Sequence, residues 1–308
     1  MTENAPMTTA APHLETKPGR GGLLLFAVVA FGWSWAWAAV IWRLGGLANP
    51  SVFTSLAVVF MWGPAIAALV CAWRYDKGRR VAALGVRPRF TGAAWFWLFL
   101  SWAIPVALIA AATLIDWAGP QVSPADPTVR VEALVRAQMQ IQGREPPPLP
   151  DGTGCVAVVA AFVFGALINM PLMISEELGW RGWLWDRWRR FGFWRGNIAI
   201  GAVWGVWHAP LIAMGYNYAM PLWGPVFMTL FCILIAPLIG LVREKGGSVW
   251  HACLFHGTVN AGAGVGLTLV SQGTGFPWLG LLGVGGAAAC LAGWALIFLG
   301  RNRRPGES

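Results

Sequence analysis

The sequence is short of charged residues. Asp, Glu, Lys and Arg together make up only 11% of its 308 residues, whereas hydrophobic residues make up 57%. A soluble domain carries roughly 25% charged residues. This shortage excludes a soluble globular protein and predicts a polytopic membrane protein whose surroundings are the lipid bilayer.

Several motifs of familiar site chemistries are absent from the sequence. The five cysteines form no CxxC pair and lie in or beside apolar segments, so we interpret them as buried apolar residues. Without HExxH a zincin-type zinc site is not supported, and without GxSxG a nucleophilic serine has no anchor. No cleavable signal precedes the first apolar segment, which we expect to remain as a membrane anchor.

Eight apolar segments are long enough to cross a bilayer, which takes roughly 20 mostly apolar residues. They cover about 22–42, 53–73, 92–115, 155–178, 197–214, 222–242, 248–270 and 277–300. The predicted fold is therefore all-α, a transmembrane helix bundle with about eight spans. We expect one transmembrane domain over 22–300, between a disordered cytosolic tail at 1–21 and a short cytosolic tail at 301–308.

The basic residues are distributed unevenly between the two sides of this predicted bundle. The net charge of +9 could suggest nucleic acid, but the basic residues lie in short loops, as the positive-inside rule expects. With the N-terminus in the cytosol, all but four of the 22 Lys and Arg residues are cytosolic. The exceptions are Arg43, Arg130, Arg136 and Arg144. We therefore expect both termini in the cytosol, no nucleic-acid partner, and an external loop at 116–154 with a short amphipathic helix near 128–142.

Three polar clusters lie in or at the ends of separate apolar segments. They are Glu176-Glu177-x-x-x-Arg181, Trp204-x-x-x-His208 and His256-x-x-x-Asn260. Ionisable groups in a membrane span are costly and are functional candidates by default. Residues four apart share a helix face, so Glu177 can pair with Arg181 while Glu176 points about 100° away. Taken singly, the clusters also suit an ion pair at a helix end, a core histidine and hydrogen bonds between helices.

Taken together, the clusters suggest a hydrolytic site. Glu176 and His208 could hold and deprotonate a water, and His256 and Asn260 could donate hydrogen bonds to an oxyanion. Glu176, His208 and His256 would also be the ligands of a divalent metal such as zinc if the site uses one. No cofactor is assigned from the sequence. His251 lies on a different helix face from His256, and we interpret it as structural.

The order of these motifs resembles that of the CPBP family. This family comprises the type II CAAX prenyl endopeptidases and the bacteriocin-processing and immunity proteins of bacteria. The resemblance covers about 155–270, and the chain departs from it at Trp204, where the family usually has Phe. The resemblance implies a role for each matching residue. The roles are water activation for Glu176 and His208, the oxyanion hole for His256 and Asn260, and support of the site for Glu177 and Arg181.

The sequence thus predicts an intramembrane endopeptidase that cleaves a membrane-associated peptide or protein. The family has been described both as metal-dependent and as a glutamate-type protease, and both readings stay open here. One alternative is a non-catalytic scaffold or immunity-type binding protein on the same bundle, and another is a small transporter with polar residues at midplane. The predicted location is a multi-pass position in a membrane, which would be the plasma (inner) membrane in a bacterium.

Overall fold

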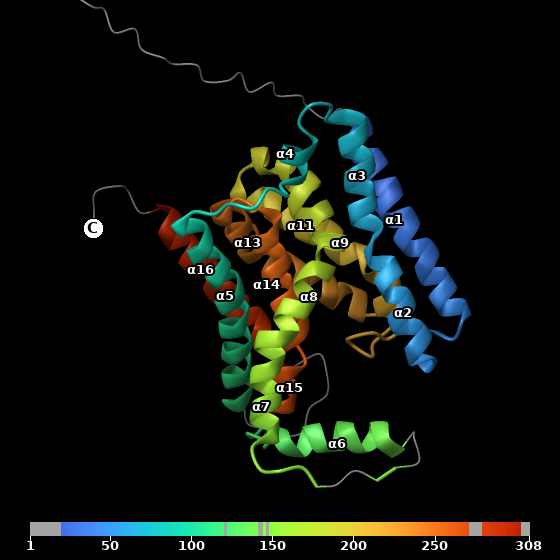
Figure 1. Cartoon of the computed structure of the whole chain (residues 1–308), viewed down its shortest axis with the longest axis vertical. Coiled ribbons are helices and arrows are strands. Elements are labelled where there is room, and N and C mark those ends of the chain that lie inside the picture. Colours follow the sequence, from blue (N-terminus) through green and yellow to red (C-terminus); the bar gives the residue numbers. More distant parts are fainter. Residues whose placement is uncertain (1–19, 120–121, 141–143, 146–147, 271–278, 303–308) are drawn as a thin grey trace, which may run out of the picture.

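The computed structural model is a bundle of helices (Figure 1). It describes residues 20–119, 122–140, 144–145, 148–270 and 279–302. Within these residues every regular element is a helix, apart from an isolated bridge between Pro124 and Val270. Seven helical segments are long and apolar enough to cross a membrane. The all-α class and the multi-pass membrane location are therefore confirmed.

The seven segments follow the predicted spans closely. They are α1 (Arg20–Arg43), α2 (Pro50–Met61) with α3 (Gly63–Tyr75), α5 (Gly92–Trp117), α7 (Thr153–Ala160) through η2 (Ala161–Gly165) into α8 (Ala166–Leu172), α11 (Phe193–Trp207) with α12 (Ala209–Ala213), α13 (Gly224–Gly246) and α16 (Val284–Asn302). The shorter elements are η1 (Gly46–Ala48), α4 (Arg80–Leu84), α6 (Pro127–Gln140), α9 (Ile174–Glu177), η3 (Leu178–Leu184), α10 (Trp185–Trp188), η4 (Arg189–Phe191), α14 (Val249–Gly262) and α15 (Val265–Thr268).

The segment predicted as a span at 248–270 is shorter than expected. Its main helix, α14, has only 14 residues, and α15 follows it as a single turn. A helix of that length rises about 21 Å at 1.5 Å per residue, less than the roughly 30 Å of a hydrocarbon core. Nearly all of α14 is buried among α5, α8 and α13. It is therefore an inner helix of the bundle, and about eight apolar helices remain consistent with the structure.

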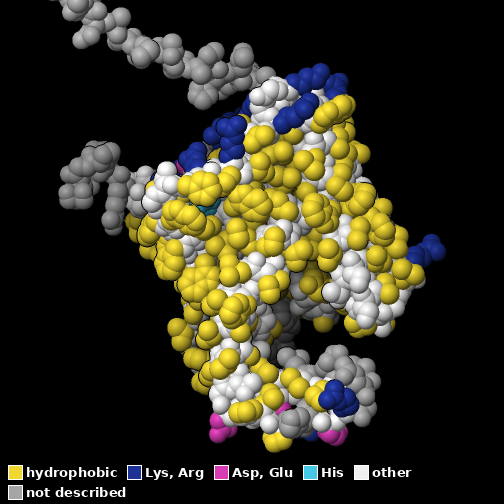
Figure 2. All heavy atoms as spheres, viewed as in Figure 1, with side chains coloured by type: hydrophobic (Ala, Val, Ile, Leu, Met, Phe, Trp, Pro, Cys, Tyr) yellow, Lys and Arg dark blue, Asp and Glu magenta, His cyan; other side chains and the backbone are white. Residues whose placement is uncertain are grey.

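The amphipathic helix expected near 128–142 is α6, which lies across one end of the bundle (Figure 1). Lys and Arg side chains gather at the opposite end, around α4 (Figure 2). That end is the predicted cytosolic side, and the orientation in the membrane stays a prediction. The expected tails lie outside the described residues, except that Arg20 begins α1 and Arg301 lies in the last turn of α16.

Prolines and glycines determine how the helices that carry the polar clusters pack. Pro210 lies at the start of α12, where its missing N–H costs no hydrogen bond, and His208 occupies the junction between α11 and α12. A Cβ on Gly205 would lie 2.4 Å from Thr229 Cα, and one on Gly257 would lie 2.9 Å from Met170 N. These glycines therefore allow α11 to approach α13 and α14 to approach α8 closely.

Candidate active site

The two adjacent glutamates lie where the helical path changes its winding. After Pro171 and Leu172, the backbone N–H groups of Glu176 and Glu177 both donate to Met173 O, at 3.1 and 2.8 Å. The chain then continues as the π-helix η3. π-helical turns are rare and occur frequently at functional sites. Both glutamate side chains are buried by this arrangement.

Glu177 is the centre of a buried triad with Arg181 and His256. Its Oε1 accepts hydrogen bonds from Arg181 Nη1 at 2.9 Å and from His256 Nδ1 at 2.8 Å. The Glu177 and Arg181 side chains are fully buried, and that of His256 is 5% exposed. The structure thus contains the ion pair that the four-residue spacing predicts. It also adds a partner from α14, 79 residues away in the sequence.

Glu176 lies beside this triad with a different partner. Its Oε2 accepts a hydrogen bond from the indole Nε1 of Trp204 at 2.8 Å, and the residue is 3% exposed. Glu176 therefore has a neutral donor on one oxygen, whereas Glu177 has a cation. Two neighbouring carboxylates in unlike surroundings are the usual sign that each has its own chemical task.

His208 faces the same cluster from the junction of α11 and α12. Its Nδ1 lies 2.9 Å from Trp204 O. Because a carbonyl oxygen can only accept, Nδ1 is assigned the proton, and Nε2 of the neutral ring carries a lone pair. The His208 ring contacts the rings of Trp204 and Trp207, with centroids 5.6 and 4.8 Å apart. The His208 ring therefore packs against two aromatic rings.

Trp204 joins the three motifs. Its ring meets the His256 ring edge-on at 5.1 Å, and the Arg181 guanidinium carbon lies 4.5 Å from the indole centroid. Through these contacts and its bond to Glu176, the structure brings the glutamate pair, Arg181, His208 and His256 into one connected cluster. These residues come from α9, η3, α11, the junction between α11 and α12, and α14.

Asn260 stands slightly apart from this cluster. It lies one helical turn beyond His256 on α14, it is exposed, and its Nδ2 donates to the thioether of Met173 at 3.1 Å. A thioether sulfur is a weak acceptor. The Asn260 amide is therefore held only loosely in this position.

His251 lies outside the site. Its Nδ1 and Nε2 face the carbonyl oxygens of Ser248 and Ala94, at 3.2 and 3.0 Å. The ring thus ties the start of α14 to the first turn of α5, which agrees with the structural interpretation from the sequence.

The donor geometry does not suit a resident metal ion. Among the described residues, no three His, Cys, Asp or Glu side chains lie close enough together to hold one. Glu176, His208 and His256 belong to one cluster, but their hydrogen bonds run to Trp204 and Glu177 and not toward a common point. We therefore derive the chemistry below without a step through a metal.

The sequence reasoning missed a second ionic network, which supports η3. Asp76, at the end of α3, is 1% exposed and accepts hydrogen bonds from Trp183 Nε1 at 3.0 Å and from Arg187. Burial lowers the pKa of the Arg187 guanidinium, and the charge of Asp76 opposes that shift. The available signal was that Asp76 is the sole acidic residue of a strongly basic loop. The network fixes η3, and with it Arg181, against α3.

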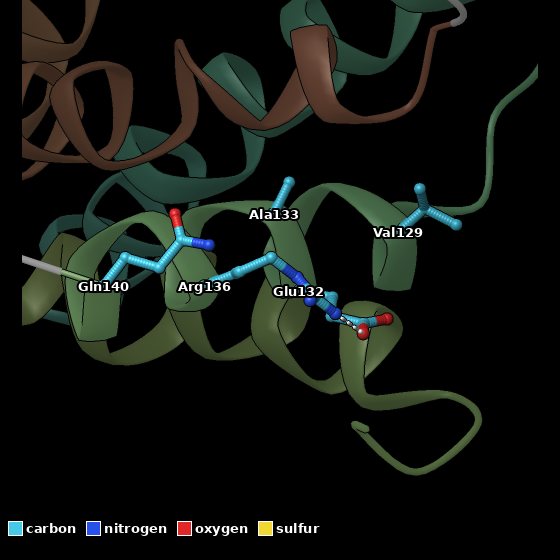
Figure 3. Close-up of a pocket in the computed structure, with 5 residues that line it drawn as sticks. All are labelled: Val129, Glu132, Ala133, Arg136 and Gln140. Carbon is cyan, nitrogen blue, oxygen red and sulfur yellow. Dashed lines mark hydrogen bonds and ion pairs between the residues drawn. The ribbon is translucent and has the colours of Figure 1, made fainter. Parts of the chain in front are cut away.

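A separate hollow lies along the exposed side of α6 (Figure 3). Its lining residues are Val129, Glu132, Ala133, Arg136 and Gln140. None of them belongs to the cluster described above. We therefore assign the candidate site to the buried cluster and not to this hollow.

Comparison with protein families now gives these contacts a context. The model of the family described as Type II CAAX prenyl endopeptidase Rce1-like matches residues 150–262. This match supports the resemblance to the CPBP family over that part of the chain. The matched segment contains all three motifs and runs from just before α7 to the end of α14. A comparison with curated proteins gives no match. At the level of the family, the match supports a CAAX-protease-like peptidase embedded in the membrane.

Proposed function

We propose that the protein cleaves a peptide bond of a membrane-associated substrate with a water activated by Glu176. The observation that carries this proposal is the unequal environment of the glutamate pair. Glu177 is neutralised by Arg181, whereas Glu176 has only the indole N–H of Trp204. The second oxygen of Glu176 has no hydrogen-bond donor among the described residues and is available to a water.

In the proposed first step, Glu176 takes a proton from the water while the water oxygen attacks the substrate carbonyl carbon. His208 Nε2 carries a lone pair and helps to hold that water. The protonated Glu176 then returns the proton to the leaving amine as the C–N bond breaks. The immediate products are a carboxylic acid and an amine, which become a carboxylate and an ammonium group by proton exchange in water, and Glu176 is again a carboxylate.

The negative charge that forms on the carbonyl oxygen requires donors. His256 Nδ1 donates its hydrogen bond to Glu177, so a donor to the oxyanion must be Nε2. We propose that the ring carries a proton on both nitrogens, as an imidazolium, and donates to the oxyanion through Nε2. With both glutamates ionised, the charges of Arg181 and this imidazolium bring the cluster to neutrality. We propose Asn260 as the second donor, which exchanges its weak thioether acceptor for the oxyanion.

We expect Glu176→Gln to abolish cleavage while the protein still folds. The amide nearly matches the carboxylate in shape but cannot take a proton from water. His208→Ala should be similarly severe, whereas Asn260→Ala should cost about 10²–10³ in rate, as for the loss of one oxyanion donor. The measurement is cleavage of a peptide library by the purified protein in liposomes, with thermal stability recorded in parallel.

The matched control is Glu132→Gln, the same substitution on α6, outside the cluster. It should leave cleavage unchanged. Full activity in Glu176→Gln would end the proposed mechanism. A protein that cleaves nothing in the library, yet binds a peptide equally well before and after Glu176→Gln, would favour the non-catalytic binding role.

A further inference from the structure

Trp204 contacts four charged or titratable side chains of the cluster, Glu176, Arg181, His208 and His256, and it has no role in the mechanism proposed so far. Its Nε1 donates to Glu176, its ring carries Arg181 on one face, and its edge contacts His256. Its own carbonyl oxygen accepts from His208. Resting on the proposed function, we infer that Trp204 is a positioning residue that orients the Glu176 carboxylate for proton transfer.

The indole N–H suits this task because it is a donor only. A carboxylate has two oxygens, and the bond from Trp204 occupies Oε2. Oε1 is then directed away from the indole and remains to accept the proton of the water. The indole cannot accept that proton itself, so the proton stays on Glu176 until the leaving amine takes it.

The indole of Trp204 is in turn held in place by Arg181 and Glu177. The Arg181 guanidinium lies over its ring, and Glu177 holds that guanidinium by a 2.9 Å hydrogen bond. The ring itself is 3% exposed. A Glu side chain with three rotatable bonds gains a single orientation only if its partner is itself immobile. Such preorganisation accelerates the chemical step without tightening substrate binding.

The sequence offers a substitution that isolates the N–H group. Phe is the residue that the family resemblance leads one to expect at position 204, and it keeps an aromatic ring but has no donor. Trp204→Phe therefore removes the bond to Glu176 while it retains a ring under Arg181 and beside His256.

The same helix also provides a matched control. Trp207 is fully buried on α11, and its ring contacts the same His208 ring at 4.8 Å. Its Nε1, however, is buried without a hydrogen-bond partner among the described residues. Trp207→Phe removes the same atoms as Trp204→Phe but breaks no hydrogen bond of the side chain.

The experiment measures kcat and KM of wild type, Trp204→Phe, Trp207→Phe and Glu176→Gln with one peptide in liposomes, together with the thermal midpoint of each. We expect Trp204→Phe to lower kcat about 10- to 100-fold at a KM within twofold, as for a lost hydrogen bond to a charged group. Trp207→Phe should keep kcat within threefold. Trp204→Phe should lower the thermal midpoint more than Trp207→Phe, because only Trp204→Phe breaks a hydrogen bond.

The results distinguish a failure of the positioning role from a failure of the proposed function. Equal kcat in the two Phe variants would overturn the positioning role while leaving Glu176 as the base. Full activity in Glu176→Gln would instead overturn the proposed function itself. If Trp204→Phe does not fold, benzothienylalanine at position 204 replaces it, because this analogue keeps the shape of indole without the N–H. Wild-type kcat in that protein would refute the inference, and a 10- to 100-fold loss would support it.

Discussion

Glu177→Gln tests whether Glu177 acts as a buried charge or only as a hydrogen-bond acceptor. Oε1 accepts both hydrogen bonds of the triad, whereas Oε2 is buried and has no hydrogen-bond partner in the described part of the chain. A glutamine can therefore keep its oxygen toward Arg181 and His256 and place its NH₂ where Oε2 was. The substitution removes the negative charge but keeps an oxygen that can accept the hydrogen bonds from Arg181 and His256.

The expected loss is large because Arg181 is fully buried. Among the residues that the structure describes, two of its nitrogens, Nε and Nη2, have no hydrogen-bond partner, and Glu177 is its counter-ion. Removing one partner of a buried pair costs about 3–5 kcal/mol, since it leaves an uncompensated charge in a poorly solvated place. We expect the free energy of unfolding of the purified protein in mixed micelles to fall by about that amount.

A matched pair on α6 provides the control for this prediction. Glu132 and Arg136 are also a glutamate and an arginine four residues apart, and Arg136 Nη2 lies 3.1 Å from Glu132 Oε1. Their side chains, however, are 31% and 48% exposed. Glu132→Gln should cost no more than about 0.5 kcal/mol. Equal stability losses in the two variants would refute the argument that burial makes the Glu177 charge essential. The double variant Glu177→Gln/Arg181→Met should lose less than the sum of the single losses.

Two further predictions concern the metal and the membrane orientation. Phenanthroline should leave the cleavage rate within twofold, because no three donor side chains of the described residues converge; a loss that added zinc restores would contradict this. Reporter fusions after residues 20 and 304 should give a cytosolic signal and a fusion within 120–150 an external one, because the basic residues favour the N-terminal side as inside. An external signal from either terminus would refute that topology.

The apolar spans could be read from the sequence because hydropathy acts over many residues at once. What hydropathy could not show is the depth and length of α14, which has only 14 residues and is surrounded by other helices. An inner helix and a spanning helix have equally apolar sequences, so composition alone gave both the same prediction. The π-helical winding of η3 could not be predicted from the sequence either, because an α-helix and a π-helix can be formed by the same types of residue.

Within the site, contacts along one helix were predictable and contacts between helices were not. The pairing of Glu177 with Arg181 follows from their spacing. The bond from His256 to the same oxygen joins residues 79 apart, and the bond from Trp204 to Glu176 joins residues 28 apart. Those bonds depend on how closely α11 and α14 approach the glutamates. The motifs indicated that Glu176, His208 and His256 belong together, but the indole between them came only from the structure.

The adjacency of the two glutamates explains why one site can hold both a fixed charge and a reactive carboxylate. On a helix, neighbouring side chains diverge by about 100°, so one partner cannot neutralise both. Arg181, one turn on, reaches Glu177 and leaves Glu176 to face α11. A single glutamate that paired with Arg181 would be a weaker base. A single glutamate that did not pair with Arg181 would leave this arginine buried without a counter-ion. With two glutamates, His256 and Arg181 share one carboxylate, and the other keeps an oxygen for the water.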